Sequence, residues 1–152
     1  MNILLSSIGK FKAGPERALY ENYTKRLPWK ITLKEFEVKK SLATPQRRAE
    51  EAKLLLAASA DADHVIALDE AGRDMGSAVF AAHLQKRRDT GDRAVAFIIG
   101  GADGLDETVR ARADLLLSLG RMTWPHLLVR GLLAEQLYRA YSIMNNHPYH
   151  RE

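Results

Sequence analysis

The stretch Ala94-Val-Ala-Phe-Ile-Ile99, which Gly100 and Gly101 follow directly, is the strongest indication of a strand in the chain. Six consecutive apolar residues, some of them β-branched or aromatic, are typical of a strand buried on both faces, and the glycines end it abruptly. Shorter apolar runs predict strands over residues 3–8, 65–68 and 115–119. A broken alternation over residues 31–38 predicts a strand with one wet face.

Helical patterns lie between these strands. Pro15 suits the first turn of a helix over residues 16–26, and Thr44-Pro45 is typical of an N-cap with proline at the first helical position. The predicted helices cover residues 16–26, 44–60, 77–88, 106–113 and 126–144. Strands that alternate with helices predict an α/β domain, with a mostly parallel sheet and helices on both faces.

The composition fits one domain that spans residues 1–152, since 46% of the residues are hydrophobic. The chain has no cysteine, which excludes disulfides, zinc–thiolate sites and a thiol nucleophile. The net charge of +4 permits an RNA partner without requiring one. Residues 1–8 are too short for a membrane span and lack a basic leader, so we expect a strand there and a cytoplasmic protein.

Three loops, over residues 68–73, 100–105 and 119–125, each follow a predicted strand. In a parallel sheet, ligands collect beyond the carboxyl ends of the strands. Gly100-Gly-Ala-Asp-Gly104 would let the backbone approach a ligand, but it has neither the G-x-G-x-x-G spacing nor a P-loop lysine. The loop after Leu119 could frame an adenine or methionine group. Ordinary strand-to-helix turns explain both loops from their spacing at least as well.

The helix predicted over residues 126–144 is apolar over a wide arc, which is typical of a buried helix or of an interface; we favour a homodimer interface. The tail after it carries His147, Tyr149, His150 and Arg151. The two histidines lack further ligands at a suitable spacing, so we expect no metal. Stacking by tyrosine and phosphate or base contact by arginine fit RNA better, although a frayed terminus is the ordinary alternative.

Four segments, which occur in this order, closely resemble the ribosomal RNA large subunit methyltransferase H family. They are Phe97-Ile-Ile-Gly-Gly-Ala-Asp-Gly104, Trp124-Pro-His-Leu-Leu-Val-Arg130, Ala134-Glu-Gln-Leu-Tyr-Arg-Ala140 and Asn146-His-Pro-Tyr-His-Arg-Glu152. Those enzymes are SPOUT methyltransferases that methylate N3 of a pseudouridine in 23S rRNA. The resemblance covers the whole chain, and the four segments together are highly specific.

The resemblance implies a SPOUT α/β knot, a C-terminal trefoil knot in which the chain end threads through a loop, against the usual rule for protein topology. It also implies S-adenosyl-L-methionine bound at the knot. The matching positions are Leu68, Gly100, Gly101, Leu119, Gly120, Arg121, Met122, Thr123 and Trp124. Arg121 departs from a loop that is usually small and apolar, so we expect its side chain to point to solvent. Asp103 stands where the family often has glutamate.

The resemblance further implies a homodimer in which the tail of one subunit closes over the cofactor site of the other. Tyr149, His150 and Arg151 match that tail. Methylation of N3 requires loss of its proton, so His150 is the natural candidate base, Arg151 would stabilise negative charge, and Tyr149 would stack on or orient the base. N3 lies on the Watson–Crick edge, so the target base must be unpaired or flipped. A small protein has little surface for reading RNA, so we expect 23S rRNA in the assembled ribosome as the substrate.

Two other functions are weighed against this one. A non-catalytic RNA-binding factor in ribosome assembly would use the same basic surface but need not bind S-adenosylmethionine. A nucleotide-binding oxidoreductase should carry a glycine fingerprint after the first strand. Gly9-Lys-Phe-Lys-Ala-Gly14 fits that fingerprint poorly.

Overall fold

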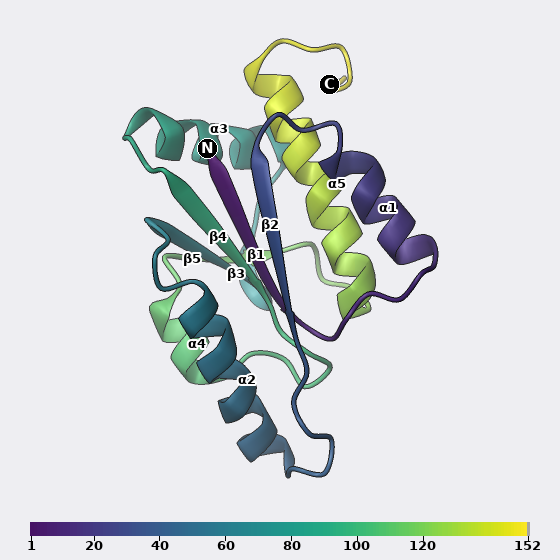
Figure 1. Ribbon diagram of the computed structural model, residues 1–152. Helices are drawn as coiled ribbons and strands as arrows, with labels where there is room; N and C mark the ends of the chain where they lie inside the picture. Colours follow the sequence, from purple (N-terminus) through teal and green to yellow (C-terminus); the bar gives the residue numbers. More distant parts are fainter. Residues whose placement is uncertain (152) are drawn as a thin grey trace.

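A computed structural model describes residues 1–151 and shows a five-stranded sheet in which every pair of neighbouring strands is parallel (Figure 1). The strand order is β2-β1-β4-β3-β5. The elements are β1 (Asn2–Ile8), α1 (Pro15–Thr24), β2 (Lys30–Phe36), α2 (Thr44–Ala58), β3 (His64–Asp74), α3 (Ser77–Asp89), β4 (Ala94–Ile99), α4 (Glu107–Arg112), β5 (Leu115–Ser118) and α5 (His126–Met144). The predicted α/β class and parallel sheet are confirmed.

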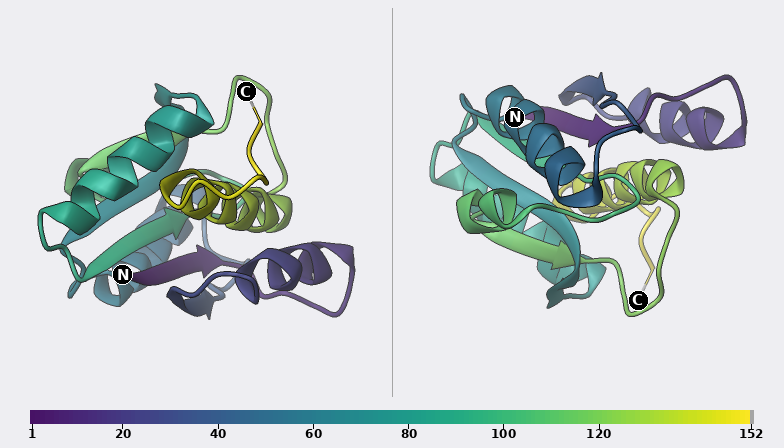
Figure 2. Two further views of the ribbon diagram at one scale, coloured as in Figure 1. Left: turned by 90° about the horizontal axis from the view of Figure 1, so that it is seen from above. Right: turned by 90° about the horizontal axis from the view of Figure 1, so that it is seen from below.

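Helices cover both faces of the sheet, as the alternation of elements predicts (Figure 2). Helices α1, α3 and α5 pack on one face, where Phe97 of β4 lies with Phe80 of α3 and Leu133 of α5. Helices α2 and α4 pack on the other face, where Ile98 meets Leu55 of α2 and Val109 of α4. Phe97 and Ile98 are neighbours in β4 and both are fully buried, which explains why this strand is apolar without alternation.

Two sequence predictions about element boundaries need correction. Thr44 is not the N-cap of α2, because Ala43 holds that position and no side chain caps the helix. Strand β3 does not end at Leu68, because pairing with β5 resumes at Arg73 after an irregularity in the register. By contrast, β4 and α5 have the bounds that the sequence predicts.

Packing within one copy of the chain buries most of the wide apolar surface of α5. The helix packs against α1, α3 and the sheet, and Ala134, Leu137 and Tyr138 are buried there. An interface with a second copy is therefore not needed to account for this surface, and the homodimer stays a prediction. The threading of the carboxyl-terminal segment through a loop also stays a prediction.

The direction of α5 separates the tail from the carboxyl ends of the strands. The helix begins beside Gly9, at the end of β1, and it ends on the side where β1 starts (Figure 1). Its 19 residues span about 28 Å at the usual helical rise. The tail that follows therefore lies at the amino-terminal edge of the sheet, where Tyr149 meets Tyr23 near the end of α1.

Candidate cofactor cleft

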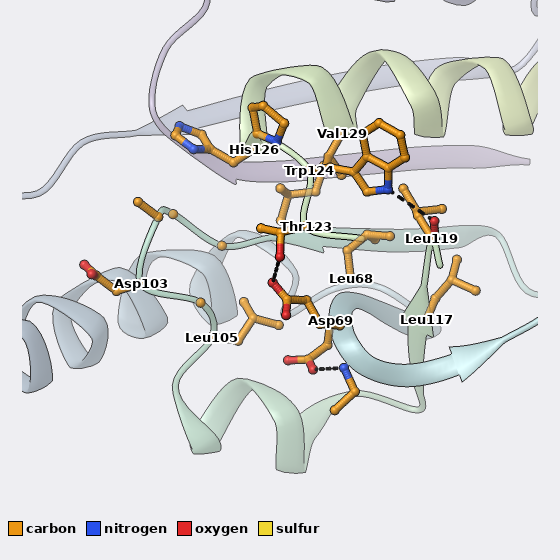
Figure 3. Close-up of a pocket in the computed structure, with 18 of the residues that line it drawn as sticks. Leu68, Asp69, Asp103, Leu105, Leu117, Leu119, Thr123, Trp124, His126 and Val129 are labelled. Atoms are coloured by element: carbon orange, nitrogen blue, oxygen red, sulfur yellow. Dashed lines mark hydrogen bonds between the residues drawn. The ribbon is translucent and has the colours of Figure 1, made fainter. Parts of the chain in front are cut away.

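A cleft of about 790 Å³ opens at the carboxyl ends of β3, β4 and β5 (Figure 3). The three loops that the sequence singled out converge on it, together with the start of α5. Its lining comprises Leu68, Asp69, Glu70, Ala71, Ile99, Gly100, Gly101, Ala102, Asp103, Gly104, Leu105, Arg110, Leu117, Leu119, Gly120, Met122, Thr123, Trp124, Pro125, His126 and Val129. A volume of this order is usual for a site that takes a small molecule or cofactor.

The structure brings together every residue assigned to the cofactor from the sequence except Arg121. The residues that line the cleft are Leu68, Gly100, Gly101, Leu119, Gly120, Met122, Thr123 and Trp124. Arg121 is exposed and is not part of the lining, in keeping with the expectation that its side chain points to solvent. Met122 and Trp124 are 74% and 40% exposed, so the third loop presents apolar side chains at the cleft's outer wall.

Two of the loops depend on glycine for their path. A Cβ on Gly100 would lie 2.9 Å from Leu105 Cδ2 and 3.1 Å from the carbonyl oxygen of Gly104, so the turn after β4 closes only without a side chain. Gly120 has a φ of 105°, which L side chains rarely adopt. The turn after β5 is further held by Ser118 Oγ, which lies 2.9 Å from the carbonyl oxygen of Gly120.

The ion pairs at the cleft could not be predicted from the sequence, because their partners are distant in the chain. Asp69, with a side chain only 5% exposed, forms a 2.8 Å ion pair with Arg110 of α4. Asp103 lines the cleft and forms a 2.6 Å ion pair with Arg47 of α2, which does not line it. These pairs hold the first and second loops against the helices on that face of the sheet.

His126 lines one end of the cleft, and the buried Arg130 lies one turn further along α5; the sequence predicts neither as a functional residue. His126 is half-buried and lines the cleft at the start of α5. Burial, and then the nearby Arg130 guanidinium, lower the pKa of His126 below its ordinary value. Arg130 is fully buried, and its Nη2 donates to the carbonyl oxygens of Ile8 and Gly9, each at 2.7 Å.

The predicted catalytic residues do not lie in this cleft within the chain. Tyr149 Oη donates to Glu135 Oε1 at 2.9 Å, and its ring meets that of Tyr138 edge-on at 4.8 Å between centroids. His150 Nδ1 lies 3.3 Å from Arg139 Nη1. Arg151 is exposed. The tail is therefore held against the far end of α5, and none of its three predicted residues lines the cleft.

The described residues also bear on metal and membrane binding. Across residues 1–151, no three histidine, aspartate or glutamate side chains are grouped so that they could hold a metal ion. No helix in that part of the chain is long and apolar enough to cross a bilayer. The cleft lies after β3, β4 and β5 rather than after β1, which is not the arrangement that the dinucleotide-binding alternative requires.

Comparison with known proteins identifies the family. The family model described as a predicted SPOUT methyltransferase matches residues 1–150. A protein of Paramagnetospirillum magneticum named ribosomal RNA large subunit methyltransferase H is 58% identical over 99% of both chains. A protein of the same name from Rhizobium meliloti is 45% identical, again over 99% of both chains.

Solved structures agree at the level of the fold. A probable methylase family protein from Haemophilus influenzae matches 99% of this chain and 71% of its own, with a TM-score of 0.61 and 15% identity. A putative methylase family protein from Neisseria gonorrhoeae matches 98% of this chain and 95% of its own, with a TM-score of 0.57 and 12% identity. The full-length match to the family model and the identities to full-length relatives show that this chain belongs to the SPOUT methyltransferase family.

Proposed function

We propose that the protein methylates large-subunit ribosomal RNA, transferring a methyl group from S-adenosyl-L-methionine to N3 of pseudouridine 1915 in 23S rRNA. Membership of the family makes the protein a methyltransferase, and the names of its full-length relatives support ribosomal RNA as the substrate class. The observation that carries the proposal is the cleft itself, in which the loops after β3, β4 and β5 meet. The finer choice of nucleotide rests on the resemblance of the four ordered sequence segments.

The residues of the cleft fit S-adenosylmethionine. Leu117, Leu119 and Val129 provide apolar walls suited to the adenosine and thioether parts of the cofactor, and the glycine loops leave backbone groups accessible. The carboxylates of Glu70 and Asp103 line the same space and match the positive charges on the sulfonium and amino groups. When bound, the cofactor supplies an already activated methyl group, so the protein's main contribution is alignment and management of the N3 proton.

The catalytic unit that we propose is a homodimer with a composite site. The tail lies at the opposite edge of the sheet from the cleft, about one length of α5 away. Tyr149, His150 and Arg151 can therefore act on a bound base only in the cleft of a second copy. Leu128 and Leu132, which are partly exposed and four residues apart on α5, and the exposed Trp124 offer apolar side chains for such an interface.

The assembled ribosome is the form of the substrate that we propose. The chain of 152 residues forms one five-stranded sheet with its covering helices, and the surface of a unit this small offers few contacts for selecting one nucleotide. A structured particle can present the target base unpaired and supply further contact surface. Purified protein should therefore methylate ribosomes or large subunits much faster than free 23S rRNA; equal rates on the two substrates would contradict this part of the proposal.

Mass spectrometry of 23S rRNA tests the function directly. Nuclease fragments from cells with and without the gene should differ by one methyl group at the proposed pseudouridine, and the gene restored on a plasmid should return it. Unchanged RNA in the deletion strain would contradict the proposal. Calorimetry should also show binding of S-adenosylmethionine, which a non-catalytic assembly factor need not bind.

Subunit complementation tests the composite site. A tail variant, His150→Ala with Arg151→Ala, and a cleft variant, Gly120→Val, should each be inactive as homodimers. The tail variant should still bind the cofactor, because its cleft is intact. Mixed dimers of the two variants contain one intact cleft facing one intact tail, so mixing and refolding should restore activity. Mixed dimers without activity would show that cleft and tail act within one chain.

A further inference from the structure

The identity of the group that removes the N3 proton rests on the proposed function. His126 has the only imidazole among the residues that line the cleft (Figure 3). It lies at the same end of the cleft as Asp103, away from Leu117 and Leu119 at the other end. No hydrogen bond to its ring nitrogens is found among the described residues, so both remain open to a ligand.

The carboxylates of the cleft are each engaged by another group. Asp69 accepts from Arg110 at 2.8 Å and from the backbone N–H of Ala71 at 2.8 Å. Glu70 accepts from Thr123 Oγ1 at 3.3 Å.

Asp103 is engaged in the same way by Arg47 at 2.6 Å. Of the lining side chains that can accept a proton, His126 is thus the one without a hydrogen bond among the described residues, while Glu70 is bonded only to a neutral hydroxyl.

The tail histidine is poorly placed to accept a proton. Arg139 Nη1 lies 3.3 Å from His150 Nδ1, and a guanidinium can only donate, so Nδ1 is the acceptor of this contact. The neutral ring then carries its proton on Nε2. His150 consequently presents an N–H donor, which suits a carbonyl oxygen of the target base better than its N3 proton.

The His126 ring packs against the backbone of Gly9. Gly9 ends β1 with a φ of 87°, and a Cβ built there would lie 3.0 Å from His126 Nε2 and 3.6 Å from Arg130 Nη2. A side chain at this position would therefore press on the imidazole and would need a backbone conformation that L residues rarely adopt. Arg130, one turn further along α5, holds this backbone by donating to the carbonyl oxygens of Ile8 and Gly9.

We infer that His126 is the general base that accepts the N3 proton of the target base. The N3–H bond breaks and its proton goes to the imidazole, while the electron pair on N3 forms the bond to the methyl carbon. The pair of the breaking carbon–sulfur bond stays on sulfur, so the positive charge passes from the sulfonium to the imidazolium. The tail of the partner copy then supplies donors to the base rather than the acceptor.

The electrostatic surroundings keep His126 in its basic form at neutral pH. Burial and Arg130 both lower its pKa. Glu35 of β2 faces Arg130 at 3.3 Å and offsets part of its charge. Glu51 of α2 is buried beside Gly101. Its burial is the main cause that raises the pKa of its carboxyl, and the charge of Asp103 is the second. Glu51 is thus the rival proton acceptor, although it does not line the cleft.

The test compares the variants His126→Asn and His126→Gln with Glu51→Gln, which removes the rival acceptor. His83→Asn is the matched histidine control, because His83 lies by the amino-terminal edge of the sheet, next to His64. Single-turnover methylation of unmodified ribosomes is measured across pH. The wild-type rate should level off above the pKa of His126. Both His126 variants should be slower by about 10²–10⁴-fold at neutral pH, and their deficit should shrink as hydroxide deprotonates N3 directly. His83→Asn should match the wild type.

Two readouts separate a base from a merely structural residue. Calorimetry should give the same affinity for S-adenosylmethionine in the His126 variants and the wild type, and NMR should show the His126 ring titrating below the ordinary histidine range. A wild-type pH profile in either His126 variant, loss of cofactor binding in both, or transfer of the pH-dependent defect to Glu51→Gln would overturn the inference. An inactive wild-type protein would instead overturn the proposed function itself.

Discussion

Replacing the buried Arg130 by methionine should destabilise the protein more than any surface substitution. The side chain has 0% exposure, and its Nη2 donates to the carbonyl oxygens of Ile8 and Gly9 at 2.7 Å each. Its Nη1 donates to Glu35 Oε1 at 3.3 Å, and the guanidinium stacks over Phe11 at 4.6 Å from the ring centroid. Methionine keeps most of the volume of the side chain but none of the donors.

The expected loss follows from what the substitution leaves behind. Removing one partner of a buried ionic contact costs about 3–5 kcal/mol, because the remaining groups stay desolvated without a partner. Each orphaned carbonyl contributes about 1–3 kcal/mol to such a loss. Arg130 itself is penalised by burial, which lowers its pKa, so we expect the lower half of the first range. For a chain of this size the thermal midpoint should fall by roughly 10 °C.

Urea denaturation followed by circular dichroism measures this loss. Arg17→Met is the control, because Arg17 and its partner Glu21 are both more than half exposed on α1, and its midpoint should match the wild type. A free energy of unfolding for Arg130→Met within about 1 kcal/mol of the wild type would refute the reasoning, since even one unsatisfied carbonyl should exceed that value.

Three further changes test other parts of the structure. In Gly72→Ala the new Cβ would lie 2.7 Å from the carbonyl carbon of Leu116, so β3 and β5 must separate and thermal melting should show a loss of about 1–3 kcal/mol. His64 and His83, whose Nε2 atoms are 3.0 Å apart, both have pKa values lowered chiefly by burial. The unfolded chain therefore takes up protons that the folded chain refuses, so stability should fall as the pH drops below 6.5, and less steeply in His83→Gln. Tyr149→Phe removes a 2.9 Å hydrogen bond to a carboxylate of α5, so methyl transfer should slow while calorimetry shows unchanged cofactor affinity.

The parts of the fold that the sequence predicts best are those in which one local rule dominates. Strand β4 is apolar throughout because it is the middle strand of the sheet and is covered on both faces. Strand β3 is predicted too short because its second half, after Leu68, is polar and contains Gly72. That glycine serves a close approach to the backbone of β5 rather than a turn, which only the pairing of two distant segments reveals.

In the candidate site, too, some features can be predicted from the sequence and others cannot. Glycine-bearing loops after strands are visible in the sequence, and the sheet brings them together because parallel strands share one carboxyl edge. The ion pairs of the cleft are not visible, because Asp69 and Arg110 lie on different elements. Arg130 is the sharpest case: arginine is almost always exposed, and nothing local indicates that its partners are carbonyl groups 121 and 122 residues away.

The same contact links the stability of the fold to the geometry of the cleft. Arg130 holds the end of β1 by a hydrogen bond. Gly9 at that end has no side chain, so the His126 ring can pack against its backbone. A weaker anchor would therefore release the contact between this strand end and α5, on which the position of the imidazole depends, while the pairing of β1 with β2 remained. The opposite wall, at Met122 and Trp124, is exposed and apolar. In this arrangement the end of the cleft at His126 is held by the buried contacts of Arg130, whereas the exposed side chains of the outer loop are free to adjust to the cofactor, RNA or a second copy.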